Sequence, residues 1–252
     1  MRVLISAGAS GLGLAIAEKF LNEGARVHVC DIDSAAIDKI KNYHQKLSGS
    51  LCDASNPDQV DSLFDDADRA LGGLDVLINN VGIAGPTARI EDIEYQDWRR
   101  TLEVDLDSFF LCTKLAIPRL KLNTTSSIIN ISSTAGWTGY PLRSPYAVAK
   151  WGVVGFSKTM AMELGEYRIR VNCICPGSLS GDRMDRVIAA EAKAKGVDER
   201  SIRDGYTSQV SLKTFIDPTD IAEAVYFLCS PAAQRISGQT ISVDGNTETL
   251  RA

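Results

Sequence analysis

Short apolar runs alternate with longer stretches of helical apolar spacing along most of the chain. The runs are rich in branched residues and end at glycine, proline or small polar residues, a pattern typical of buried strands. Seven runs are predicted as strands: one beginning at Arg2 or Val3, one ending at Cys30, then Ser48–Leu51, Leu74–Ile78, Ile128–Ile131, and the runs within RIRVNCICPG and QTISVDG.

Helices are predicted between these strands. One opens at the first glycine turn, and the others span about Pro57–Leu71, Glu94–Arg119, the stretch from Pro145 through Phe156, and Asp217–Leu228. Alternating strands and helices imply right-handed crossovers, which make the strands parallel and place helices on both faces of the sheet. We therefore predict one doubly wound Rossmann-type α/β domain over residues 1–252. Residues 179–210 are mostly charged and are predicted as a substrate lid of one or two mobile helices.

Composition narrows the class of protein. A chain of 252 residues with 44% hydrophobic content can bury a large core, and neither a linker nor a low-complexity segment divides it. The apolar runs stop well short of a membrane-spanning length, and a strand that begins at Arg2 or Val3 leaves no room for a signal peptide. We expect a soluble cytoplasmic protein. The net charge of −5 argues against a nucleic-acid partner, which normally meets a basic face.

Cysteine and histidine usage argues against a metal site. The six cysteines fall mostly inside apolar patterns and are predicted to be small buried hydrophobes. Cys173 and Cys175 lie on the same side of a strand end, where a metal is conceivable, but no histidine accompanies them. With only His28 and His44 in the chain, a zinc enzyme or a Ser/His hydrolase is improbable, and no metal is predicted.

The first strand, glycine turn, helix and second strand form a dinucleotide-binding arrangement. Gly11 and Gly13 would let the backbone approach a pyrophosphate, and the helix that begins there offers free amides to the phosphates. Asp31 follows the second strand, where a carboxylate accepts hydrogen bonds from the adenosine ribose, so we predict NAD in preference to NADP. The positions Ser10 and Ile32 supply no Arg or Lys to bind a 2′-phosphate. Asp31 would alternatively cap a helix, although Asp33 or Ser34 is better placed.

Polar residues also follow later strands. Asp53 is expected to meet the adenine amino group. Asn79 and Asn80 lie at the tip of the strand Leu74–Ile78, where they would either stabilise the turn or contact the cofactor, two interpretations of about equal weight. Pro176-Gly177 ends another strand beside the expected nicotinamide position.

Ser133 follows the strand Ile128–Ile131, at the sheet edge where α/β proteins bind ligands. Tyr146 and Lys150 lie one turn apart on the next helix and share a face. A phenol is a poor base at neutral pH unless a nearby cation favours its ionised form, and Lys150 can be that cation. Ser133 could then hydrogen-bond the same substrate oxygen. By itself the Tyr/Lys spacing is also ordinary for a solvated helix face.

The segments SAGASGLG, Asp31, Cys52-Asp53, NNVG, Ser133, YAVAK and PG resemble the short-chain dehydrogenase/reductase family in order and spacing, over nearly the whole chain. The resemblance implies that Tyr146 is the general acid/base, that Ser133 polarises the substrate oxygen, and that Lys150 supports the phenolate and holds the nicotinamide ribose. It also implies a homotetramer assembled through the long helices and the C-terminal region. The implied cofactor contacts are Ser6, Gly8, Ser10, Gly11, Leu12, Gly13, Asp31, Ile32, Cys52, Asp53, Asn80, Val81, Gly82, Tyr146, Lys150, Pro176 and Gly177.

Two positions depart from the family pattern. Ser6-Ala7 stands where the family usually has Thr-Gly, so the turn must accept an extra methyl group or shift a glycine role to Gly8, and we expect binding to survive. Asp105 resembles the site of the family's helix Asn, a fourth catalytic member that holds a proton-relay water. Buried beside Lys150, this carboxylate would pair with the ammonium or take up a proton itself. Alternatively, only its backbone carbonyl is needed.

Substrate contacts are expected from the residues that flank the catalytic elements. Arg183 and Arg186 would bind an anionic group if they point inward, but arginines on an exposed helix are more often solvated. The predicted pocket residues are Ser133, Trp137, Tyr140, Arg143, Ser178 and Met184.

These observations favour an NAD-dependent dehydrogenase that interconverts a secondary alcohol and a ketone by hydride transfer. A second hypothesis is an NAD-binding sensor or assembly subunit whose catalysis Asp105 weakens. An acyl-thioester ketoreductase is a third, but Asp31 counts against it because the resemblance associates such reductases with NADP.

Overall fold

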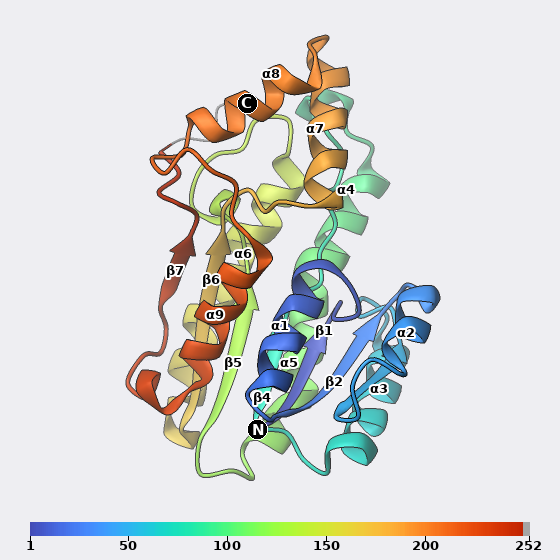
Figure 1. Cartoon of the computed structure of the whole chain (residues 1–252), viewed down its shortest axis with the longest axis vertical. Coiled ribbons are helices and arrows are strands. Elements are labelled where there is room, and N and C mark those ends of the chain that lie inside the picture. Colours follow the sequence, from blue (N-terminus) through green and yellow to red (C-terminus); the bar gives the residue numbers. More distant parts are fainter. Residues whose placement is uncertain (249–252) are drawn as a thin grey trace.

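The computed structural model describes residues 1–248, so the last four residues of the predicted 1–252 domain lie outside the described residues. Seven strands form one parallel sheet in the order β3-β2-β1-β4-β5-β6-β7, which confirms the predicted Rossmann-type architecture (Figure 1). The strands are β1 (Arg2–Ser6), β2 (Arg26–Asp31), β3 (Leu47–Leu51), β4 (Val76–Asn79), β5 (Ser126–Ile131), β6 (Ile169–Pro176) and β7 (Thr240–Val243).

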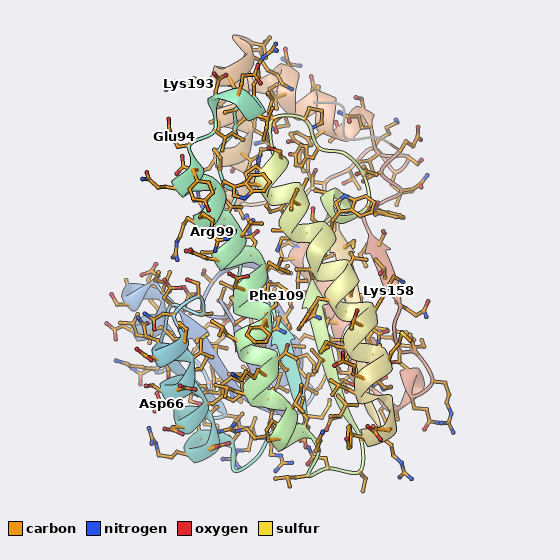
Figure 2. All side chains as sticks on the ribbon, turned by 180° about the vertical axis from the view of Figure 1, so that it is seen from behind. Asp66, Glu94, Arg99, Phe109, Lys158 and Lys193 are labelled. Atoms are coloured by element: carbon orange, nitrogen blue, oxygen red, sulfur yellow. The ribbon has the colours of Figure 1, made fainter. Side chains whose placement is uncertain are left out.

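Helices cover both faces of the sheet. Because side chains alternate along a strand, Val3 and Ile5 of β1 join the apolar cluster under one set of helices, and Leu4 joins the cluster under the other. The first face is covered by α1 (Gly11–Asn22), α2 (Ser34–Ile40) and α9 (Pro218–Cys229), and the second by α3 (Pro57–Leu71), α5 (Ser108–Leu120) and α6 (Ser144–Leu164), as Figures 1 and 2 show.

The chain reverses its direction of travel across the sheet beside β1. This strand pairs with both β2 and β4, and the crossovers that leave β1 and β4 depart toward opposite sides. At such a switch point the loops beyond the strand ends separate and leave a crevice. The glycine turn that follows β1 and the Asn79-Asn80 segment at the end of β4 therefore meet at one edge of the sheet.

The long helix predicted for Glu94–Arg119 is interrupted. It consists of α4 (Tyr95–Leu102), a π-helical turn η2 (Glu103–Asp107) and α5, which run on without a loop beside α6 (Figure 2). A π turn inserts one extra residue into a helix, and such turns are frequent at functional sites. This turn contains Asp105, whose side chain is fully buried.

The predicted lid folds as two helices, α7 (Asp182–Lys195) and α8 (Glu199–Ser208), which lie beyond the carboxyl ends of the strands (Figure 1). They pack on each other through Ile188, Ala192, Ile202 and Tyr206. The mobility of this segment stays a prediction. Single 3-10 turns complete the described chain: η1 (Ile90–Asp92), η3 (Thr134–Gly136), η4 (Gly165–Tyr167) and η5 (Pro231–Ala233).

The remaining sequence expectations concern burial. All six cysteines are free and buried, as predicted. In residues 1–248 no helix combines the length and the apolar character needed to cross a membrane.

His28 on β2 is buried beneath α3. Its Nδ1 lies 2.8 Å from Ser48 Oγ and its Nε2 lies 3.1 Å from Ser50 Oγ, which in turn donates to Asp66 Oδ2. Burial lowers the pKa of His28 to about 4, against the opposing charge of Asp66. Between that value and the ordinary histidine pKa, the unfolded chain binds a proton that the folded chain does not.

Stability should therefore fall as the pH falls through this range. We expect the wild type to lose up to about 2 kcal/mol of unfolding free energy between pH 7 and pH 5, measured by urea denaturation, and H28Q to lose much less. The matched control is His44, the other histidine, since H44Q should keep the wild-type pH dependence. An H28Q protein with an unchanged slope would contradict the assignment.

Candidate active site

A cleft of about 950 Å³ lies at the carboxyl edge of the sheet, under α7. Its walls come from the glycine turn after β1, the ends of β2, β4 and β5, the first turns of α6, and the segment after β6. These elements are far apart in the sequence and meet because parallel strands all end at this edge.

The glycine turn accommodates Ala7, which stands where the resemblance leads us to expect glycine. Ala7 itself adopts the left-handed conformation, with φ of 50°, so its glycine role is not shifted to Gly8. An alanine in that region costs about 1–2 kcal/mol of conformational energy. Gly8 is required for a different reason, because a Cβ there would lie 2.6 Å from Val29 Cγ1.

The first turn of α1 faces the cleft. Gly11 has φ of 50°, and a Cβ on Gly13 would overlap the carbonyl oxygen of Ala7. Ser10 precedes the helix without a side-chain hydrogen bond to the first-turn amides. Ser10, Gly11, Leu12 and Gly13 all line the cleft, so free amides and a close backbone approach are present where a pyrophosphate is expected. The residues therefore fit a dinucleotide.

Two predicted cofactor contacts have another role. Ser6 and Gly8 do not line the cleft in the described part of the chain. Ser6 is buried, and its Oγ accepts hydrogen bonds from the amides of Asn80 and Val81 at 2.9 and 3.2 Å. Both residues join the glycine turn to its neighbours, and their direct contact with the cofactor stays a prediction.

Asp31 lies at the cleft beside this turn. Its Oδ2 accepts from the amide of Ala9 at 3.2 Å and its Oδ1 from the amide of Asp33 at 3.1 Å. Asp33, and not Asp31, caps α2 by accepting from the amides of Ala35 and Ala36, so the alternative role for Asp31 is excluded. Ile32 is exposed and also lines the cleft.

Cys52 and Asp53 line the same end of the cleft together with Arg100, a residue that the sequence did not indicate. Arg100 Nη2 donates to Asp53 Oδ2 at 2.9 Å, and Ser55 donates to Asp53 Oδ1 from its amide and its hydroxyl. Burial opposes ionisation of Asp53, but these hydrogen bonds and the guanidinium charge outweigh it and lower the carboxyl pKa. The predicted adenine contact of Asp53 stays a prediction.

The two asparagines after β4 divide the roles that the sequence left open. Asn79 Nδ2 donates to Asn130 Oδ1 at 2.8 Å and to Thr113 Oγ1 at 3.0 Å, deep in the core. Asn80 Nδ2 donates to the carbonyls of Ser6 and Ala7. Asn79 is thus structural, whereas Asn80 holds the glycine turn and also lines the cleft, as do Val81 and Gly82.

Ser133, Tyr146 and Lys150 all line the cleft. Ser133 follows β5 in an extended conformation, and Tyr146 and Lys150 lie on the first turns of α6. Lys150 Nζ lies 5.7 Å from the centroid of the Tyr146 ring, in a position where nearly all of the Lys150 side chain is buried. Ser132 Oγ donates to the carbonyl of Lys150 at 2.8 Å, which fastens α6 to the end of β5.

Asp105 pairs with Lys150. Its Oδ2 lies 3.5 Å from Lys150 Nζ, and its Oδ1 accepts from the amide of Ile83 at 2.7 Å. Both side chains are almost completely buried, and a Cβ on Gly82 would lie 3.2 Å from each of the two charged groups. The carboxylate, and not just the backbone of Asp105, therefore faces Lys150 and supplies its counter-charge.

The predicted substrate residues fall into two groups. Tyr140, Arg143, Ser178 and Met184 line the cleft, and so do Pro176 and Gly177. Trp137 lines neither this cleft nor the cavity beside it in residues 1–248, and 48% of its surface is exposed. The short turn η3 places Trp137 on the surface although it lies between two catalytic elements, and its contact with the substrate stays a prediction.

A buried carboxylate that the sequence did not indicate joins the lid to the cleft. Glu191 of α7 accepts hydrogen bonds through Oε1 from the hydroxyls of Tyr140 and Tyr206, at 3.2 and 2.6 Å. The two tyrosine hydroxyls also hydrogen-bond each other. Burial raises the pKa of both phenols, so both hydroxyls keep their protons at neutral pH. Helical spacing alone could have flagged Glu191, since it lies on the apolar side of α7.

The sheet order, the glycine turn at the switch point and the free helix end define a dinucleotide-binding Rossmann protein. Known proteins support the same class. The family model described as Enoyl-(Acyl carrier protein) reductase matches residues 7–246. The 7alpha-hydroxysteroid dehydrogenase of Escherichia coli (strain K12) is 34% identical over 246 residues, which cover 96% of this chain and 92% of that protein.

Two solved structures are also similar. NAD+-bound xylitol dehydrogenase has a TM-score of 0.93 and 25% identity, with 97% of each chain covered. A variant of actinorhodin polyketide ketoreductase with NADPH has a TM-score of 0.92 and 28% identity, with 98% of this chain and 97% of that chain covered. The chain belongs to the short-chain dehydrogenase/reductase family. It is an NAD(P)-dependent oxidoreductase of the kind that acts on hydroxyl or keto groups.

The close contact at Gly13 gives a direct test of the cofactor end. G13A should weaken NADH binding at least about tenfold, measured by calorimetric titration, because the added methyl overlaps the backbone of the turn. The matched control is G155A on α6, where a Cβ meets nothing within 4 Å and NADH affinity should not change. Wild-type affinity in G13A would show that this turn does not hold the dinucleotide.

Proposed function

We propose that the protein is an NAD-dependent dehydrogenase that interconverts a secondary alcohol and a ketone. The observation that carries this proposal is the Lys150 ammonium, 5.7 Å from the ring of Tyr146 and paired with buried Asp105, at the end of a cleft that fits a dinucleotide. A bound nicotinamide supplies or accepts the hydride at its C4. The remaining chemistry, the movement of one proton and the orientation of one oxygen, falls to the side chains of the chain.

Tyr146 is the proposed general acid/base. During oxidation its phenolate takes the proton of the substrate hydroxyl, and during reduction the phenol returns that proton to the carbonyl oxygen. Lys150 places a positive charge beside the Tyr146 ring, and Asp105 keeps that ammonium in place because it binds Lys150 and the amide of Ile83 together. Ser133, at the end of β5, would donate a hydrogen bond to the same substrate oxygen and so orient the reacting carbon.

Asp31 supports NAD as the cofactor. A 2′-phosphate on the adenosine ribose would approach a carboxylate that backbone amides already hold at the edge of the cleft. The negative charges of the phosphate and the carboxylate would repel each other, whereas the ribose hydroxyls of NAD can donate to the carboxylate oxygens of Asp31. The proposed cofactor-binding set is Ser10, Gly11, Leu12, Gly13, Asp31, Ile32, Cys52, Asp53, Asn80, Val81, Gly82, Tyr146, Lys150, Pro176 and Gly177.

Asp105 also favours a specific alternative, an NAD-binding sensor or assembly subunit with weak catalysis. This alternative predicts tight NADH binding without turnover of any ketone. The geometry supports the catalytic proposal better, because the carboxylate is used to position Lys150. The acyl-thioester ketoreductase is disfavoured by the same Asp31 that supports NAD.

The proposed assembly is a homotetramer in the cytoplasm. Large apolar side chains are exposed on the outer faces of the helices that the family resemblance assigns to the interface, among them Phe110 of α5 and Trp151 of α6, each 52% exposed. Burial of these side chains against another copy would stabilise such an assembly.

Removal of the phenolic hydroxyl tests the activity. We expect Y146F to lower kcat for NADH-dependent reduction across a ketone panel at least about 100-fold while NADH affinity is kept, since the proton donor is lost and the fold is not. The control is Y95F on the exposed surface of α4, which should match the wild type. Full turnover by Y146F would overturn the proposal.

Cofactor choice is tested at Asp31. D31N removes the charge but keeps an oxygen acceptor for the amide of Ala9, so the preference for NADH over NADPH in kcat/KM should fall at least about tenfold. D38N, on the exposed side of α2, should leave the preference unchanged. If D31N keeps the cofactor preference of the wild type, Asp31 does not select the cofactor.

A further inference from the structure

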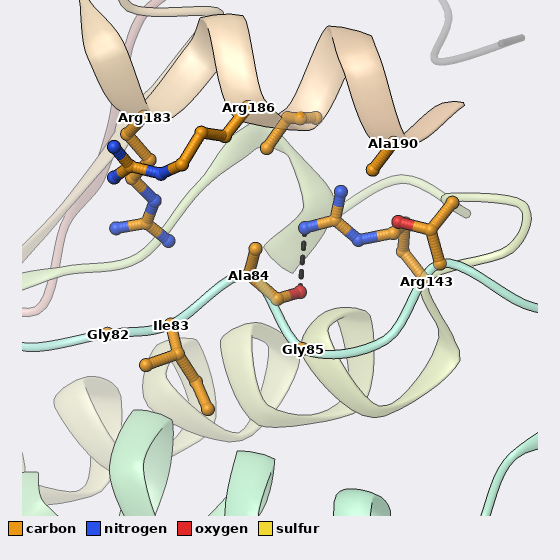
Figure 3. Close-up of a pocket in the computed structure, with 10 residues that line it drawn as sticks. Gly82, Ile83, Ala84, Gly85, Arg143, Arg183, Arg186 and Ala190 are labelled. Carbon is orange, nitrogen blue, oxygen red and sulfur yellow. Dashed lines mark hydrogen bonds between the residues drawn. The ribbon is translucent and has the colours of Figure 1, made fainter. Parts of the chain in front are cut away.

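A second cavity of about 400 Å³ adjoins the cleft. It lies between the loop Gly82–Gly85 on one side and α7 on the other, and Arg143 reaches into it from the segment before α6 (Figure 3). Arg143, Arg183 and Arg186 each line both the cavity and the cleft, so the two spaces form one continuous site. The reaction proposed above uses none of these three side chains.

Arg143 is 2% exposed, which is unusual for a guanidinium. Its Nη2 donates to the carbonyl of Ala84 at 2.7 Å (Figure 3). Its Nε and Nη1 are buried without a hydrogen-bond acceptor among residues 1–248. A buried charged group with unsatisfied donors is costly unless another molecule provides the acceptors. The donors of Arg143 thus require an acceptor that this part of the chain does not supply.

Arg143 also lies close to the proposed reaction centre. Its Cζ is 5.3 Å from the centroid of the Tyr146 ring and 5.3 Å from that of the Tyr140 ring. An acceptor bound to Arg143 would therefore lie close to the ring of Tyr146. This separation suits two ends of one small substrate.

The charges around the site are unbalanced. Arg183 and Arg186 are exposed on α7, line the cavity across from the loop Gly82–Gly85 (Figure 3), and form no ion pair within residues 1–248. The acidic groups of α7 are mostly engaged elsewhere: Asp185 pairs with Arg203, and Glu191 accepts from two tyrosines and faces Lys195. Asp182 lines the cleft but is exposed to solvent. Three guanidinium groups thus line the cavity, and no carboxylate of residues 1–248 lines it with them.

We propose that the substrate carries an oxyanion, which Arg143 binds inside the cavity and which Arg183 and Arg186 cover from the lid. This inference rests on the proposed alcohol/ketone activity and names the class of its substrate. Carboxylate and phosphate share the required chemistry, because both present several oxygen acceptors to guanidinium donors. Bound there, the anion satisfies the buried donors of Arg143 and offsets the repulsion among the three arginines.

The test compares charged and neutral ketones of similar size. With NADH, kcat/KM is measured for acetoacetate against methyl acetoacetate, and for dihydroxyacetone phosphate against dihydroxyacetone. We expect the charged ketone to be favoured at least about tenfold in one pair, and that pair identifies the anion as a carboxylate or a phosphate. No charge preference in either pair would overturn the inference.

Variants separate anion recognition from a structural role of Arg143. Relative to the neutral ketone, R143M should lower kcat/KM for the charged ketone at least about tenfold, and the double variant R183Q/R186Q should lower it about threefold. The control is R200Q on α8, where Arg200 is exposed and lies outside both cavities. If the variants lower kcat/KM equally for the charged and the neutral ketone, Arg143 only braces the loop and the inference fails. Because Arg183 and Arg186 are exposed, their variant tests the site even if R143M does not fold.

Binding measurements keep this inference distinct from the proposed function. Tyr146-dependent reduction of both ketones without charge preference leaves the function standing and rejects the anion site. If no ketone is reduced, the function fails, and calorimetric titration of the NADH complex with acetoacetate and dihydroxyacetone phosphate decides the site. If the charged ketone binds more weakly to R183Q/R186Q, the anion site is supported. Equal binding of charged and neutral ketones rejects the anion site.

Discussion

The buried ion pair between Lys150 and Asp105 is the interaction on which the site depends. It joins the π turn of the long helix, the first turns of α6 and, through the amide of Ile83, the loop after β4. Removing two charges from water is costly, and one partner left alone destabilises a protein by about 3–5 kcal/mol, so these three elements are constrained to meet in one arrangement. The same arrangement places an ammonium beside Tyr146 and leaves Gly82 against both charges, where a side chain would intrude.

The two ends of the cleft are built on this centre. Asn80 and Ser6 connect the loop after β4 to the glycine turn, so the pyrophosphate end and the Lys150 end share one backbone segment. On the other side, the loop carries Ala84, whose carbonyl holds Arg143. The cofactor, the reacting oxygen and the proposed oxyanion would therefore all bind along residues 80–84. Arg183 and Arg186 of the lid line the same two spaces.

The sequence predicted the features that follow from local pattern. The sheet, the glycine turn and the set Ser133, Tyr146 and Lys150 could be placed because strand ends and helix spacing put them at one edge. Features that depend on distant contacts could not. The π turn around Asp105 has no period of its own, and Arg100 is brought to the cleft only by packing. Trp137 lies outside the cleft for a related reason, since proximity in the chain does not determine which way a short turn points its side chain.

The most direct test of this account is a double-mutant cycle on the free energy of unfolding. D105N keeps an oxygen acceptor for the amide of Ile83 and removes the negative charge, and K150M removes the positive charge at similar volume. If the pair holds the site together, each single variant leaves one buried charge unpaired. The double variant should then lose about 2 kcal/mol less unfolding free energy than the two single variants lose in sum. Losses that add to within about 0.5 kcal/mol would show that Asp105 and Lys150 are not coupled and would contradict the account.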